Sequence, residues 1–135
     1  MGLLGQIAYR SRHYLCVAPQ NTALGVASPL ALGVHDFKVA RVQYLKAKLR
    51  AYLESSNGVP VATFDVYRLD GTAANTTITG SVLTTSSTAS GVLYEADLTT
   101  VLQGTYDGAL EGRLWCAPIT TGQVVICRSA WIDYE

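Results

Sequence analysis

The feature that most constrains this chain is the repeated alternation of apolar and polar side chains between residues 61 and 134. In the segment 61–68, Ala62, Phe64 and Val66 occupy every second position. Such a spacing places these residues on one face of a β-strand, whereas a helix would need a period of about 3.6 residues. The same kind of pattern recurs in the segments 76–85, 92–98, 104–118 and 122–134.

Short polar turns separate these segments and determine their expected connections. Turn-forming residues stand at Asp70-Gly71, in the run 86–91 and at Thr121-Gly122. We expect Thr121-Gly122 to close a hairpin between the last two strands, with Cys116 opposite Cys127. The same register would place Trp115 opposite Arg128 as a cation–π pair. Strands separated by short turns predict a mainly β fold, a β-sandwich or small barrel of about seven strands.

The segment 38–54 fits two structures. Helical spacing is met by Val39, Val42, Leu45, Leu49 and Leu53, and the Leu, Ala, Lys and Arg residues favour a helix. Strand alternation is met by Leu45, Ala47, Leu49, Ala51 and Leu53. Because the hairpin-type run 55–58 and another strand pattern follow, we favour a strand and keep a helix at 38–54 as the alternative.

Residues 1–36 differ from the rest, since they contain two Pro and four Gly and hold neither period for long. We expect an extended N-terminal arm over 1–36, with one short strand around Tyr14 to Ala18, that runs over a surface without entering a core. The β-sandwich domain would then comprise 37–135. The arm packs either on its own domain or on a neighbouring subunit, and both alternatives stay open.

Composition narrows the function classes. Of the 135 residues, 49% are hydrophobic and only 15% are charged, which excludes a disordered chain. Ten Lys and Arg residues balance ten Asp and Glu residues, so the whole domain is not a polycation built for nucleic acid. The apolar stretch 14–34 is interrupted by Pro19 and Pro29, and the first apolar run precedes the basic residues. We therefore expect neither a membrane span nor a secretory signal, and a soluble protein synthesised in a cytoplasm.

Three cysteines and two histidines offer little for metal or nucleophile chemistry. An odd cysteine count does not make a complete disulfide framework, and we favour buried thiols over a bridge between Cys116 and Cys127. Neither His13 nor His35 lies at metal-ligand spacing from other ligands. We expect no metal and no cofactor.

The acidic and aromatic residues indicate no active site. Glu95 and Asp97 lie on one strand face at a spacing that a glycosidase could use, but we interpret them as a solvated face. His35-Asp36 is interpreted as a turn or capping pair. Trp115 and Trp131 could form a ligand platform, although strand packing is the favoured interpretation. No hydrolase, zinc-protease or nucleotide-binding fingerprint occurs, so we expect no enzyme and no catalytic residue.

Charge is segregated along the chain. Residues 1–50 carry seven basic side chains against Asp36 alone, a net +6, and residues 51–135 carry a net −6. The two halves can neutralise each other within one fold or between neighbouring subunits, and a local patch for nucleic acid is the least favoured alternative. The expected subunit-interface residues are Tyr9, Arg10, Arg12, Tyr14, Lys46, Lys48 and Arg50.

Two stretches resemble bacterial and phage immunoglobulin-like modules. In the run 45–72, a strand ends at a loop followed by Gly58-x-Pro60, and the next strand ends in Asp70-Gly71-Thr72. In the run 91–112, an alternating strand is followed by a short turn and by Gly104-x-Tyr106. Such modules occur on tailed-bacteriophage particles and on bacterial adhesins. The resemblance implies an immunoglobulin-like β-sandwich.

The resemblance and the charge segregation together predict a non-enzymatic structural protein of a bacteriophage particle. We expect a capsid decoration or head accessory protein, or else a neck, tail or baseplate component, made in the host cytoplasm and located in the virion. Its partners would be other virion proteins and further copies of itself, without a membrane and without nucleic acid. A carbohydrate-binding or adhesion module is the alternative.

Overall fold

The computed structural model describes residues 11–17, 19–22, 30–36, 46–69, 77–102, 108–117 and 124–135. These residues form β-strands joined by turns, with one short helix. The elements are β1 (Ser11–Cys16), β2 (Gln20–Thr22), β3 (Leu30–Asp36), β4 (Ala47–Ser55), β5 (Val61–Leu69), β6 (Leu83–Thr85), β7 (Leu93–Asp97), α2 (Thr99–Leu102), β8 (Ala109–Ala117) and β9 (Val125–Tyr134).

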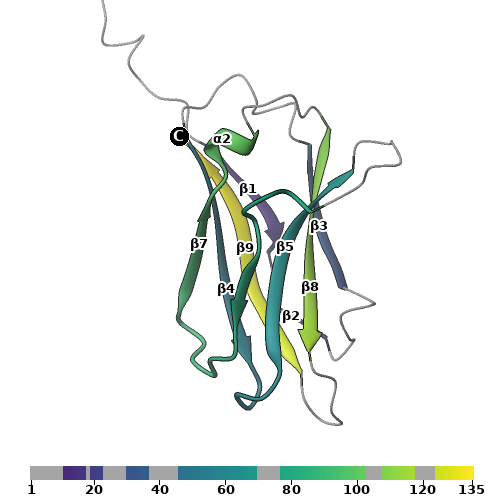
Figure 1. Cartoon of the computed structure of the whole chain (residues 1–135), viewed down its shortest axis with the longest axis vertical. Coiled ribbons are helices and arrows are strands. Elements are labelled where there is room, and N and C mark those ends of the chain that lie inside the picture. Colours follow the sequence, from purple (N-terminus) through teal and green to yellow (C-terminus); the bar gives the residue numbers. More distant parts are fainter. Residues whose placement is uncertain are drawn as a thin grey trace, which may run out of the picture.

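The strands form two antiparallel sheets that pack face to face (Figure 1). Sheet A has the order β1-β9-β4-β7, and the short β2 also pairs with β9. Sheet B has the order β3-β8-β5-β6. Without β2, the described strands counted along the chain run 1-8-3-6 in sheet A and 2-7-4-5 in sheet B. This is the strand order of a jelly roll, an antiparallel sandwich of two interlocked Greek keys.

The predicted mainly β sandwich is confirmed, but its strand order differs from the immunoglobulin arrangement. An immunoglobulin domain has strands ABED in one sheet and CFG in the other. Here the first and last strands, β1 and β9, are neighbours in sheet A. The turn motifs behind the resemblance are local and suit either topology. Alternation predicts which face of a strand is buried, and it does not predict which strands pair.

The strand prediction for 38–54 is confirmed where the structure describes it, and residues 38–45 lie outside the described part. Ala47, Leu49, Ala51 and Leu53 are fully buried, as strand alternation requires. β4 lies between β9 and β7 in sheet A, so both of its edges are paired. Pairing on both sides and burial of one face outweigh the helical propensity of its residues.

Two predicted hairpins are wrong, because both connections cross between the sheets. The run 55–58 leads from β4 in sheet A to β5 in sheet B, and β8 and β9 also lie in different sheets. Cys116 is therefore paired with Ala62, and Trp115 with Thr63. Because a sandwich buries one face of each sheet against the other, consecutive strands can face each other without sharing hydrogen bonds.

The predicted strand 76–85 is shorter than expected. Within its described part, Thr77 forms an isolated bridge with Tyr67, and β6 begins only at Leu83. Gly80 lies between them at a φ of 82°, a left-handed conformation that ends an extended run.

The surface arm predicted for residues 1–36 is also wrong in its described part. β1 and β3 contribute one strand to each sheet. Leu15 is fully buried, and it lies so close to Gly33 that a Cβ there would come 2.7 Å from the Leu15 carbonyl oxygen. The two buried side chains of β1, Leu15 and Cys16, are adjacent, and β3 has one buried side chain in its described part, so neither strand shows an obvious alternation in the sequence. The boundary expected between 36 and 37 does not separate an arm from a core.

One hydrophobic core fills the space between the sheets. Its largest fully buried side chains include Phe64 from sheet B and Tyr134 from sheet A. The helix α2 lies at one end of the sandwich (Figure 1), where Leu98 and Leu102 are fully buried. The segment expected as a simple turn therefore also closes the core at this end.

Replacing Leu15 tests whether β1 belongs to the core. Leu15→Ala should lower the free energy of unfolding by about 2–5 kcal/mol, because it leaves a cavity between the sheets. Val17→Ala is the matched control, since Val17 is 77% exposed and its loss should change stability by less than about 0.5 kcal/mol. Urea unfolding of both variants measures the difference. Equal small losses would contradict the placement of β1.

Candidate functional site

The outer face of sheet A carries the largest group of interacting polar side chains in the described part of the chain. On β9, Ala130, Ile132 and Tyr134 point into the core, so Trp131 and Asp133 point outward. The register places Asp133 between Arg12 on β1 and Lys48 on β4. Cross-strand neighbours on one face of a sheet are close enough for side-chain contact.

The Asp133 carboxylate joins three strands. Arg12 Nε donates to Oδ1 at 2.8 Å, and Arg50 Nη1 donates to Oδ2 at 2.6 Å. The indole Nε1 of Trp131 donates to the same Oδ2 at 2.8 Å. Arg50 also donates to Glu95 on β7 at 2.9 Å, which extends the network to a fourth strand. We call Arg12, Arg50, Glu95, Trp131 and Asp133 the Asp133 cluster.

Burial and charge act in opposite directions on Asp133. Burial disfavours its ionised form, but hydrogen bonds from Arg12, Trp131 and Arg50 outweigh this effect and hold the pKa of Asp133 below its ordinary value. The hydrogen bonds to Asp133 likewise raise the pKa values of Arg12 and Arg50. Asp133, Arg12 and Arg50 are therefore all charged near neutral pH.

Trp131 is covered by its neighbours. The Arg12 guanidinium lies 4.6 Å from the centroid of its ring, and Tyr14 and Tyr52 flank it at 5.9 Å each. Only 7% of Trp131 is exposed. A tryptophan that stacks on a sugar needs an open ring face, so this residue serves packing in the structure as it stands.

The structure brings several predicted interface residues together. Arg12, Tyr14, Lys48 and Arg50 share the outer face of sheet A, and the exposed Lys46 precedes β4. Tyr9 and Arg10 lie outside the described residues. Arg12 and Arg50 belong to the positive half of the sequence, and Asp133 and Glu95 belong to the negative half. Part of the charge segregation is therefore neutralised within the fold.

Sequence reasoning missed Asp133 and Tyr52 as members of this surface. The spacing of Trp131 and Asp133, two apart on a strand, places both on one face and could have indicated them. Their partners on β1 and β4 could not be indicated, because the pairing of β9 with these strands spans most of the chain.

The only two histidines of the chain stack on each other, another contact that the sequence did not indicate. The rings of His13 on β1 and His35 on β3 lie 4.2 Å apart between centroids. His35 Nε2 and the Tyr134 hydroxyl are 2.7 Å apart. His35 is buried and lies within β3, where it is paired with Leu110, so it is not the turn or capping residue predicted for His35-Asp36, and the Asp36 side chain lies outside the described part. Burial lowers the pKa of His13. This histidine pair links the edges of the two sheets.

Sheet B carries a second polar group on its outer face. Arg113 lies 3.7 Å from the Tyr67 ring centroid and 2.7 Å from Glu111. Asp65 is buried beside them, and burial raises its pKa although Thr77 donates a hydrogen bond to Oδ2. This group ties β5 to β8.

The other acidic candidates from the sequence are hydrogen-bonded within the fold, and the potential metal ligands do not lie together in the described part of the chain. Glu95 pairs with Arg50, and Asp97 Oδ1 accepts the backbone N–H of Thr99, which lowers the pKa of Asp97. Within the described ranges, no three His, Cys, Asp or Glu side chains gather as a metal site. No helix there is long and apolar enough to cross a membrane.

Two pockets lie along β1. One, of about 290 Å³, is lined by residues of β1 to β3, including Cys16, Gln20 and Leu32. The other, of about 340 Å³, lies beside Arg12, Arg50 and Asp133. Comparison with known protein families and with curated proteins finds no match to this chain.

Removing the central carboxylate tests the Asp133 cluster. Asp133→Asn should lower the free energy of unfolding at neutral pH by about 3 kcal/mol, because two arginines lose their shared partner. Because the folded pKa of Asp133 is depressed, its contribution exists above the ordinary aspartate pKa. The difference from wild type should shrink as pH falls below about 4.

Glu95→Gln is the matched control for this prediction, since Glu95 is the exposed partner of Arg50. Its effect should stay below about 1 kcal/mol. Urea unfolding of both variants as a function of pH measures the effects. A loss for Asp133→Asn no larger than that for Glu95→Gln would contradict the central role of Asp133.

The histidine pair predicts a pH dependence of stability. Because burial lowers the folded pKa of His13, the unfolded chain binds protons more readily, and unfolding should become easier as pH falls below about 6.5. His13→Phe keeps an aromatic ring without a titrating group, so its stability should vary less between about pH 7.5 and 5.5. Thr84→Ala, an exposed substitution on β6 in the other sheet, keeps His13 and its contacts and should behave like wild type. Identical pH profiles for His13→Phe and wild type would contradict the assignment.

Proposed function

We propose that this protein is a non-enzymatic structural component of a bacteriophage particle, either a capsid decoration or head accessory protein or a neck, tail or baseplate component. The observation that carries the proposal is the jelly-roll order of the two sheets. This architecture recurs in viral capsid domains. The proposal thus rests on the strand order, since the turn motifs that resemble immunoglobulin-like phage modules suit either topology.

The polar chemistry of the described surface supports a structural role. Arg12, Arg50 and Asp133 are fixed by one another, as the 2.6–2.8 Å contacts to the carboxylate indicate. A general acid or base needs access to substrate and a proton to exchange near neutral pH. Asp133 is instead covered and held ionised. Such a network stabilises a sheet whose surface can be presented to neighbouring subunits.

We assign the contact with a neighbouring subunit to the segment that precedes β1. It contains Tyr9 and Arg10, and β1 continues it with Tyr14, which is 45% exposed. Lys48 on β4 and Lys46, directly before β4, add positive charge near Asp97. A neighbouring subunit with an acidic surface fits this group.

The alternative function, carbohydrate binding, also has a precedent, because lectin domains share the jelly-roll architecture. The coverage of Trp131 by Arg12, Tyr14 and Tyr52 counts against stacking of a sugar on that ring. Saturable binding on a glycan array, lost in Trp131→Ala with its fold retained, would favour this alternative.

Truncation before β1 tests the proposed role. Deleting residues 1–10 leaves Ser11 and Leu15 in place, so the sandwich should retain its unfolding midpoint. Particles produced with the full-length or the truncated chain are purified and analysed by quantitative mass spectrometry. The full-length chain should be present in a fixed ratio to the main capsid subunit, and the truncated chain should be reduced at least about tenfold, a loss of about 1.4 kcal/mol in binding.

Thr84→Ala is the control, because Thr84 is an exposed residue of β6 on the opposite sheet and should leave incorporation unchanged. Absence of the full-length chain from purified particles would overturn the structural role. Equal incorporation of the truncated chain would overturn the contact through residues 1–10.

A further inference from the structure

The three cysteines are all buried and none forms a disulfide, but their surroundings differ. Cys16 on β1 and Cys127 on β9 belong to sheet A, whereas Cys116 on β8 belongs to sheet B. The Cys16 thiol donates to the Cys127 carbonyl oxygen at 3.6 Å. The sequence pattern suggested Cys116 as the neighbour of Cys127 across a hairpin, and the structure instead brings Cys16 to it.

Irregularities in both strands bring these two thiols together. The β1–β9 register shifts between Tyr14 and Cys16, so Tyr14 faces outward opposite Trp131 while Cys16 turns inward opposite Ala130. The register of β9 with β4 shifts at Arg128, so Cys127 also points inward. A β-bulge redirects side chains in this way. Without either shift, one thiol would lie on the other face of the sheet.

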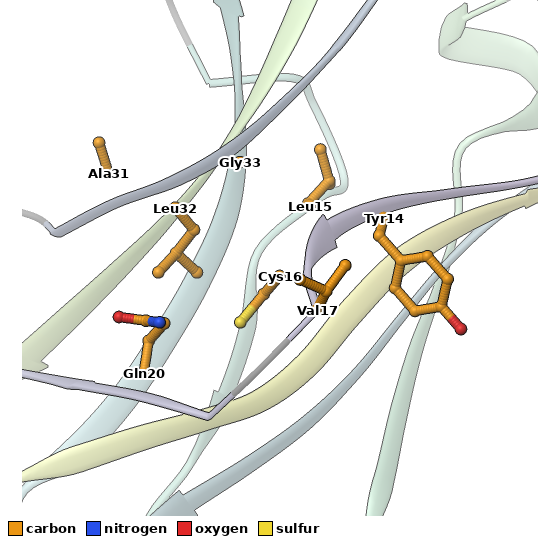
Figure 2. Close-up of a pocket in the computed structure, with 8 residues that line it drawn as sticks. All are labelled: Tyr14, Leu15, Cys16, Val17, Gln20, Ala31, Leu32 and Gly33. Atoms are coloured by element: carbon orange, nitrogen blue, oxygen red, sulfur yellow. The ribbon is translucent and has the colours of Figure 1, made fainter.

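Cys16 is only 6% exposed, but it lies at the wall of a pocket. It lines the pocket of about 290 Å³ between β1 and β3. Figure 2 shows its sulfur pointing toward the space between Leu32 and Gln20. Cys127 is fully buried and does not line this pocket. The contact with Cys16, together with burial, raises the pKa of Cys127, so Cys127 is not the thiol that reacts first.

We propose that Cys16 and Cys127 are a redox pair that closes to a disulfide when a small organic disulfide enters the pocket. The Cys16 sulfur, as thiolate, attacks the small disulfide, forms a mixed disulfide and releases one thiol. The Cys127 sulfur then attacks Cys16, the new Sγ–Sγ bond forms and a second thiol leaves. The two protein thiols are oxidised by two electrons, the small disulfide is reduced to two thiols, and these carry away both protons.

The bridge would attach the first described strand to the last one. β1 is an edge strand of sheet A, held by β9 alone within that sheet. A cross-link between residues distant in sequence restricts the unfolded chain most, so the oxidised protein should be the more stable form. The two thiols would stay reduced in a cytoplasm and would form the disulfide in an oxidising environment. This inference concerns the two thiols and holds whether or not the proposed function is right.

Thiol counting on the folded wild-type protein tests the proposal directly. The protein is incubated with oxidised glutathione, freed of reagent, unfolded and titrated for thiols, and the linked peptides are identified by mass spectrometry without reduction. Wild type has three thiols and should fall to one, with the Cys16 peptide linked to the Cys127 peptide. The melting temperature should rise by several degrees.

Variants separate this pairing from the alternative. Cys116→Ala should fall from two thiols to none and show the same rise in melting temperature. Cys16→Ala should form no internal link and show no rise. The unfolded wild type, oxidised in denaturant, should give a mixture of pairings where the folded protein gives one.

Three results would overturn the proposal. These are three thiols remaining in the oxidised wild type, a link that includes Cys116 in the folded protein, and a mixed disulfide with glutathione that persists on Cys16. The wild-type measurement needs no substitution. It can therefore still refute the proposal if one of the variants fails to fold.

Discussion

Strand β9 is the element on which sheet A depends, because it pairs with β1 and β2 on one edge and with β4 on the other. It is the last strand of the chain, and β1 is the first that the structure describes. Sheet A therefore cannot be completed until residues more than a hundred positions apart have met. Contacts of this kind carry a large entropic cost of closure and are slow to form. The interactions across the β1–β9 boundary are accordingly those that matter most for this fold.

The Asp133 cluster strengthens that boundary by electrostatics. A hydrogen-bonded strand pair can slip by one residue, which would move its whole apolar set to the wrong face. Asp133 opposes such a slip, because its carboxylate meets Arg12 on β1 and Arg50 on β4 only in one register. The net charge of zero therefore includes specific ion pairs between the two halves of the sequence. Arg12 and Arg50 from the basic half align β1 and β4 on Asp133 of β9.

Much of the fold follows from local sequence, and the parts that do not follow share a physical cause. Burial of Ala47, Leu49, Ala51 and Leu53 follows from their alternation, and so does the outward orientation of Glu95 and Asp97. The crossings from β4 to β5 and from β8 to β9 do not follow, because a short polar loop suits a hairpin or a sheet-to-sheet connection equally. β1 was expected on the surface, because a bulge at Leu15 interrupts its alternation. The sequence predicted the basic residues of the site. It did not predict the contacts of Asp133, Trp131 and the histidine pair, because these contacts form between strands that are distant in the sequence.

The internal ion pairs also change which residues can recognise a neighbouring subunit. A partner that bound Arg12 or Arg50 through a carboxylate would compete with Asp133, and separating these charges would leave a covered carboxylate uncompensated. Such a contact gains little, since one ion pair replaces another. Lys48 lies opposite the exposed Asp97, and the charge of Lys46 also acts on this carboxylate. Both lysines can exchange partners at a lower cost, because exposed pairs are weak. Tyr14 combines an exposed ring with a fixed position on β1. Recognition on this face therefore depends on the tyrosine and the lysines, while the arginines hold the strands that present them.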